Sequence, residues 1–96
     1  MIKSFGSKQT EDIYHGVKSS HARKLYPELH PKALRLLDQL NAITKIESLR
    51  VPSGNNLEKL AGNYKDYWSI RINKQWRIVF EWLDGNPYDV DVVDYH

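Results

Sequence analysis

An alternation of apolar and polar residues in the second half of the chain most constrains its fold. Trp68, Ile70 and Ile72 would share one face of a strand, and residues 76–82 repeat the pattern with two more tryptophans. Alternate side chains of a strand point to opposite faces. The turn sequences Asn73-Lys74 and Asp84-Gly85-Asn86 separate these runs from each other and from the last one. We therefore predict consecutive antiparallel strands with one apolar face that must be covered.

The first half of the chain carries helix signals. Ser7 or Thr10 is typical of a helix start and Gly16 of a helix end, and Pro31 fits the first position of a second helix. This second helix has apolar residues at the i, i+3, i+4, i+7 spacing: Ala33, Leu36, Leu37, Leu40 and Ile43. The predicted fold is α+β, with two N-terminal helices packed on one face of a small antiparallel sheet.

The same apolar patterns and turn residues also predict shorter strands and loops. We expect residues 2–5 to form a short edge strand, residues 18–29 an irregular loop with helical turns, residues 49–56 a loop, and residues 57–60 a further short strand.

Length and composition limit the possible functions. A chain of 96 residues predicts one domain, residues 1–96. The absence of cysteine excludes disulfides and zinc–thiolate sites, and it suits the cytoplasm. No apolar run approaches membrane-spanning length, so we expect no membrane contact. The histidines lack metal-ligand spacing and read as surface residues, apart from His96. Because no cofactor motif occurs either, we expect neither metal nor cofactor.

The charges are distributed unevenly. Residues 18–35 contain five cations and one acid, whereas residues 81–94 contain five acids and no Lys or Arg. The five cations, here called the basic patch, are Lys18, Arg23, Lys24, Lys32 and Arg35. Such a patch suggests a polyanion or an acidic protein partner. A solvated helix surface is the alternative, and charge alone does not decide between them.

Two arginines are candidates for phosphate binding. Alternation places Arg71 and Arg77 on neighbouring strands, side by side on the open face away from the tryptophans. Such a pair can hold a phosphate bidentately. Alternatively, they are surface arginines balanced by Glu81 or Asp91.

Three side chains suited to proton transfer or phosphate contact follow the last predicted strand: Asp94, Tyr95 and His96. Alternation places Asp94 and His96 on the face of Val90 and Val92, with Tyr95 opposite. The alternative is a strand that ends in solvated polar residues.

The run Tyr67-Trp68-Ser69-Ile70-Arg71-Ile72-Asn73-Lys74-Gln75-Trp76-Arg77, closing on Asp94-Tyr95-His96, resembles the HigB branch of the RelE/ParE toxin superfamily. The start Met1-Ile2-Lys3-Ser4-Phe5, the loop 50–55 and the Leu57-x-x-Leu60-x-Gly62 element also match. The resemblance covers nearly the whole chain.

This resemblance implies a type II toxin with a RelE-like fold: a metal-independent endoribonuclease that cuts mRNA in the A site of the 70S ribosome. A HigA-type helix-turn-helix antitoxin would inhibit it and would be its only link to operator DNA. His96 or Asp94 would exchange protons, Arg71 and Arg77 would stabilise the phosphate charge, and Tyr95 would stack on a base or bond the phosphate. Lys18, Arg23 and Lys24, with Lys59 and Lys74, would contact RNA.

One element departs from the family pattern. Some relatives carry a histidine or lysine implicated in catalysis just before the glycine of the 57–62 element. This chain has Glu58 at the likely histidine position and Ala61 near the lysine position. Lys59 would compensate, Glu58 would act as a carboxylate base, or the enzyme would be slower. Two rival functions stay open: a ParE-like toxin that inhibits DNA gyrase without nuclease activity, and a non-catalytic RNA-binding module.

Overall fold

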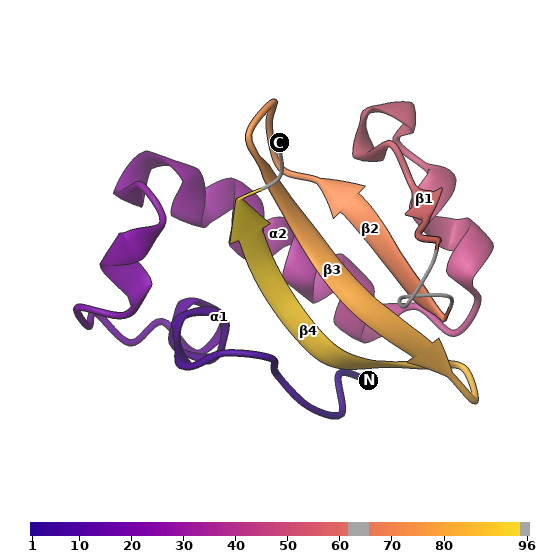
Figure 1. Cartoon of the computed structure of the whole chain (residues 1–96), viewed down its shortest axis with the longest axis horizontal. Coiled ribbons are helices and arrows are strands. Elements are labelled where there is room, and N and C mark those ends of the chain that lie inside the picture. Colours follow the sequence, from indigo (N-terminus) through magenta and orange to yellow (C-terminus); the bar gives the residue numbers. More distant parts are fainter. Residues whose placement is uncertain (62–65, 95–96) are drawn as a thin grey trace.

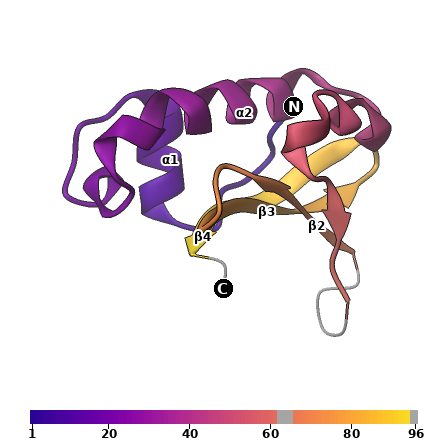
Figure 2. The same cartoon turned by 90° about the horizontal axis from the view of Figure 1, so that it is seen from above.

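The computed structural model describes residues 1–61 and 66–94 of the chain. Its elements are α1 (Lys8–His15), α2 (His30–Ala42), β1 (Glu58–Lys59), β2 (Tyr67–Arg71), β3 (Trp76–Leu83) and β4 (Asn86–Asp94). The strands form one antiparallel sheet in the order β1-β2-β3-β4. Both helices lie on the same side of the sheet (Figures 1 and 2). The predicted α+β fold is confirmed, including the short strand within residues 57–60.

The core lies between α2 and the sheet, where both predicted periods are confirmed. Its buried members on these elements are Ala33, Leu36, Leu37 and Leu40 from α2, and Ile70, Ile78, Phe80, Val90 and Val92 from the strands. Burial of each larger side chain contributes about 1.5–3 kcal/mol, so this apolar stripe is what holds α2 on the sheet. The three tryptophans are only partly buried and pack around this cluster.

Helix α1 starts and ends where the sequence indicates. Ser7 Oγ accepts a hydrogen bond from Thr10 N at 3.2 Å, and Gly16 ends the helix with a φ of 71°, which favours glycine. The same N-terminus is joined to β4, because Asp91 Oδ1 accepts hydrogen bonds from Ser7 Oγ at 2.6 Å and from Thr10 Oγ1 at 2.9 Å. In return, Val92 N donates to Thr10 Oγ1 at 2.8 Å. Capping and attachment to the sheet therefore use the same side chains.

The N-terminal segment runs along β4, but the predicted edge strand over residues 2–5 is reduced to a single bridge at Phe5. Phe5 forms a parallel bridge with Val90, and Gly6 N donates to the Val90 carbonyl at 2.8 Å. A Cβ atom at Gly6 would lie 3.0 Å from Asp91 Cβ, so the close approach favours glycine there. The segment satisfies part of the edge of β4 that would otherwise be unpaired.

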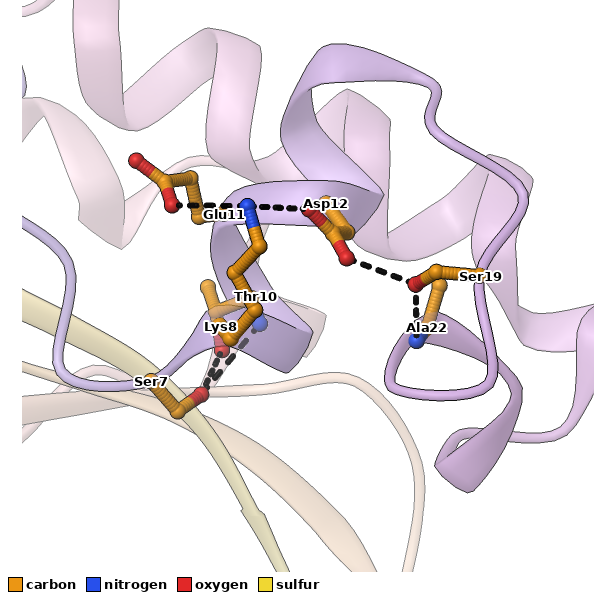
Figure 3. A network of polar contacts seen from close by, with 7 residues as sticks. All are labelled: Ser7, Lys8, Thr10, Glu11, Asp12, Ser19 and Ala22. Carbon is orange, nitrogen blue, oxygen red and sulfur yellow. Dashed lines mark hydrogen bonds and ion pairs between the residues drawn. The ribbon is translucent and has the colours of Figure 1, made fainter.

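The basic loop between the helices is held by the buried side chain of Asp12 (Figure 3). The Asp12 carboxylate accepts hydrogen bonds from Ser19 Oγ at 2.6 Å and from Lys8 Nζ at 3.1 Å. The Ser19 hydroxyl, followed by Lys8, lowers the pKa of this carboxyl below 3.8. Ser19 Oγ in turn accepts from Ala22 N at 3.0 Å. The loop contains two 3₁₀ turns, 22–24 and 27–29, which confirms the predicted helical turns.

Candidate functional site

Arg71 and Arg77 lie side by side in the sheet, as predicted. They are register partners of β2 and β3, on the face opposite the core side chains. Arg71 is half-buried, and its Nε donates to the Asn73 carbonyl at 3.2 Å. The Asn73 side chain fixes this turn by accepting hydrogen bonds from the backbone N–H groups of Gln75 and Trp76. The turn between the two strands therefore positions the Arg71 side chain.

The prediction that both arginines occupy an open face is wrong for Arg77, which is only 7% exposed. Arg77 Nε donates to Ser69 Oγ at 2.9 Å, and its Nη2 donates to the Asn56 carbonyl at 2.6 Å and to the Ser69 carbonyl at 3.4 Å. The chain segment leading into β1 thus reaches the Arg77 side chain. Alternation in β3 identifies the face of Arg77 but contains no information about what covers that face.

Glu58 is brought to the arginines by strand pairing. It is the register partner of Ser69, and its carboxylate lies 3.9 Å from Arg77 Nη1 with 54% of the side chain exposed. Asp91, one predicted partner of the arginines, is instead bound by Ser7 and Thr10. Arg77 forms an ion pair with Glu58. Lys59 is exposed, and its Nζ lies 5.5 Å from the centre of the Trp68 ring.

Asp94 lies next to these strands but on the other face. Its register partner is Trp76, whereas Arg77 is opposite Val93. Because alternate residues of a strand share a face, Asp94 lies on the same face as Val92, as predicted. Gln75 Nε2 donates a hydrogen bond to the Asp94 carboxylate at 3.1 Å. Tyr95 and His96 lie outside the described residues. The structure thus brings together Glu58, Arg71 and Arg77, with Asp94 one register position away on the opposite face.

Sequence reasoning missed three residues that contact the predicted site: Asn56, Ser69 and Gln75. The one signal for Ser69 is its small polar side chain between larger residues, on the same face as Arg71. Nothing local indicates that the Asn56 carbonyl meets an arginine twenty-one residues later.

The cations of the basic patch lie in and after the loop between the helices, on the helix side of the sheet (Figure 2). All five are exposed, as is Lys74 in the β2–β3 turn. Lys18 and Arg23 also border an apolar groove of about 750 Å³ between α1 and α2. His30 differs from the predicted surface residue, because it is half-buried with Nε2 at 2.9 Å and 3.0 Å from the carbonyl oxygens of Ala22 and Leu25.

Within residues 1–61 and 66–94, no three metal-ligating side chains gather in one place. The same part of the chain has no helix with the length and apolar character needed to cross a membrane.

Comparison with known proteins gives consistent matches. The family model of RelE-like toxins of the type II toxin–antitoxin system HigB matches residues 3–96. The toxin HigB-1 of Vibrio cholerae is 41% identical over 86 residues, which cover 88% of this chain and 87% of that protein. The endoribonuclease HigB of Proteus vulgaris is 30% identical over 97 residues, with both chains fully covered.

Solved structures match in fold. The YoeB–YefM complex from Staphylococcus aureus gives a TM-score of 0.62 at 21% identity, covering all of this chain and 98% of that one. A YafQ mutant from E. coli gives 0.65 at 18% identity, covering 98% and 91% of the two chains.

Proposed function

This chain belongs to the HigB-like family of RelE-like toxins from type II toxin–antitoxin systems, and we propose from that premise that it is a ribosome-dependent endoribonuclease. It cleaves mRNA in the ribosomal A site and so inhibits translation. One observation carries this proposal: Arg71 and Arg77 are register partners beside the carboxylate of Glu58. The P. vulgaris relative, identical at 30% of positions, is named an endoribonuclease.

The proposed reaction is an internal transesterification that needs no metal. The ribose 2′-oxygen forms a bond to the adjacent phosphorus, and the bond from phosphorus to the 5′-oxygen breaks. The products are a 2′,3′-cyclic phosphate and a free 5′-hydroxyl. One group must take the proton of the 2′-hydroxyl, and another must donate a proton to the leaving oxygen. Added charge on the phosphate must also be stabilised.

The residues of this chain suit these three tasks. Glu58 is an exposed carboxylate that can act as the base, and His96 has the side chain best suited to protonate the leaving oxygen near neutral pH. Asp94 is a further candidate for proton transfer, at the end of β4 and on the other face of the sheet from Arg71 and Glu58. Arg71 stabilises the phosphate charge. Tyr95 stacks on a base or bonds the phosphate.

The proposal is tested with purified protein and a defined mRNA. We expect cleavage only in the presence of 70S ribosomes, and products that carry a 2′,3′-cyclic phosphate. Chelators selective for transition metals, which leave the Mg²⁺ that ribosomes need, should not change the rate. Gyrase supercoiling should proceed normally in a parallel assay. Intact mRNA together with inhibited gyrase would instead support the ParE-like alternative. RNA binding without either effect would support the non-catalytic module.

The partners follow from the same proposal. The family description places these toxins in type II toxin–antitoxin systems, so we propose a HigA-type helix-turn-helix antitoxin as the inhibitor. Operator DNA is then reached only through that antitoxin. The substrate partners are the 70S ribosome and its mRNA.

The basic patch is proposed to contact ribosomal RNA. Replacing Lys18, Arg23 and Lys24 with glutamine should weaken ribosome binding and flatten its salt dependence, with each lost phosphate contact lowering the slope by about one unit. The fold should survive, because all three side chains are exposed. Binding measured across a series of salt concentrations tests this expectation.

A matched control removes the same charge elsewhere, at three exposed cations outside the patch: Lys3, Lys45 and Arg50. This control should change the slope less than the patch variant does. Equal slopes for the patch variant and the parent would show that the patch is a solvated surface.

A further inference from the structure

Arg77 has the surroundings of a buried structural arginine. Its Nε and Nη2 both donate to protein acceptors, namely the Ser69 hydroxyl and the carbonyls of Asn56 and Ser69. Ser69 itself is fully buried. A charged group this deeply buried is tolerated only when hydrogen bonds replace its lost hydration. Nε and Nη2 are thus engaged in hydrogen bonds and Nη1 lies 3.9 Å from the Glu58 carboxylate, so Arg77 cannot present a full bidentate edge to a phosphate without breaking these bonds.

These bonds attach the chain segment that leads into β1 to strands β2 and β3. Asn56, with a left-handed φ of 45°, joins the 3₁₀ turn Ser53–Asn55 to β1. Strand β1 has only two residues, too few for a stable ladder by itself. From β3, Arg77 bonds to β2 through Ser69 and to the start of the β1 segment through the Asn56 carbonyl. It therefore connects three neighbouring strands on one face.

Arg71, the register partner of Arg77, is more exposed and makes fewer hydrogen bonds in the described part of the chain. Its residue is half-buried, and within the described residues its guanidinium makes one hydrogen bond, from Nε to the Asn73 carbonyl. The Nη groups of Arg71 are therefore better placed than those of Arg77 to bind an incoming phosphate.

We infer that Arg77 is a positioning residue: with Ser69, it holds strand β1 and the Glu58 carboxylate in place, while Arg71 contacts the scissile phosphate. This division of roles rests on the proposed nuclease function. The hold on β1 is a property of the fold and can be measured without any nuclease activity.

The first experiment compares the same substitution at the two register partners, Arg71→Met and Arg77→Met. The readout is NMR hydrogen exchange at the Leu60 amide, which donates to the Tyr67 carbonyl at 2.9 Å next to the β1–β2 pairing. We expect Arg77→Met to speed this exchange by about 10- to 100-fold, the effect of losing hydrogen bonds to a charged group. Arg71→Met should leave it within about twofold of the parent. The core amide of Ile78 reports any global loss of stability.

Smaller substitutions at Ser69 test the same inference in case the Arg77→Met protein folds poorly. Ser69→Ala removes one hydrogen bond and keeps the charge, and it should speed exchange at Leu60 by about tenfold. Ser69→Thr keeps the hydroxyl and should restore both slow exchange and the parental cleavage rate. Unchanged exchange at Leu60 in Ser69→Ala and in a folded Arg77→Met protein would overturn the inference.

The second experiment measures single-turnover cleavage on saturated ribosomes in a Glu58→Gln background. Because Arg77 is inferred to act through Glu58, Arg77→Met should cost less than about threefold further once Glu58 is replaced. Arg71→Met should still cost nearly its full effect. Equal, fully additive losses for both arginines would mean that Arg77 contacts the phosphate directly, and the inference would be wrong. If the parent itself does not cleave, the proposed function fails, while the exchange measurements still decide the structural role of Arg77.

Discussion

Replacing Arg71 with alanine should lower the single-turnover rate of mRNA cleavage by about 10²–10³-fold, the usual loss when one preorganised donor to a developing oxyanion is removed. Arg71 lies on the face opposite the core beside Glu58 and Arg77. Among residues 1–61 and 66–94, the substitution deprives only the Asn73 carbonyl, in a turn, of a donor. Folding should therefore survive, and thermal denaturation checks it. Ribosome binding should also survive, because the loss belongs to the chemical step.

Arg71→Lys is the informative companion variant. Lysine keeps the positive charge but lacks the planar fork that matches a phosphate, so we expect a rate between those of the parent and Arg71→Ala. If Arg71→Ala cleaves at the parental rate while bound to ribosomes, the phosphate must be held by another group. Arg77 would then return as the principal candidate, against the inference drawn from its burial.

The overall architecture could be predicted because its signals are local and repeated. The alternation of residues 68–82 fixes which side chains face the core, and a one-residue shift in register would expose them all. This is why the side-by-side placement of Arg71 and Arg77 was predictable. Helix α1 was equally accessible, because Ser7 and Gly16 act through well-understood capping geometry.

The burial of Arg77 could not be predicted, because it depends on contacts between segments distant in sequence. The segment that covers Arg77 meets the sheet through a two-residue strand and the Asn56 carbonyl, and neither has a strong sequence signal. His30 is a similar case. Polar residues are read as exposed by default, yet its ring lies within hydrogen-bonding distance of the carbonyls of Ala22 and Leu25.

The largest expected loss comes from His96→Gln, which should reduce cleavage by about 10²–10⁴-fold, the typical contribution of general acid–base catalysis. Breaking the bond to the 5′-oxygen requires a proton for a strongly basic leaving group. An imidazole has an ordinary pKa of about 6.5, so near neutral pH it can both hold and release that proton. Glutamine keeps a similar size and a hydrogen-bonding group but cannot transfer a proton. The measurements are single-turnover cleavage in vitro and growth inhibition in cells lacking the antitoxin.

Chemical rescue separates the imidazole from any structural role of the residue. In a His96→Gly protein, added imidazole should restore part of the cleavage rate in proportion to its concentration, whereas an inert buffer of equal ionic strength should not. Tyr95→Phe should cost less than about tenfold if Tyr95 acts by stacking, because phenylalanine keeps the ring and with it the base–aromatic contact. A folded His96→Gln protein that cleaves at the parental rate would exclude the imidazole from the mechanism. The proton-transfer roles would then fall to Glu58, which faces Arg77 across 3.9 Å, and to Asp94.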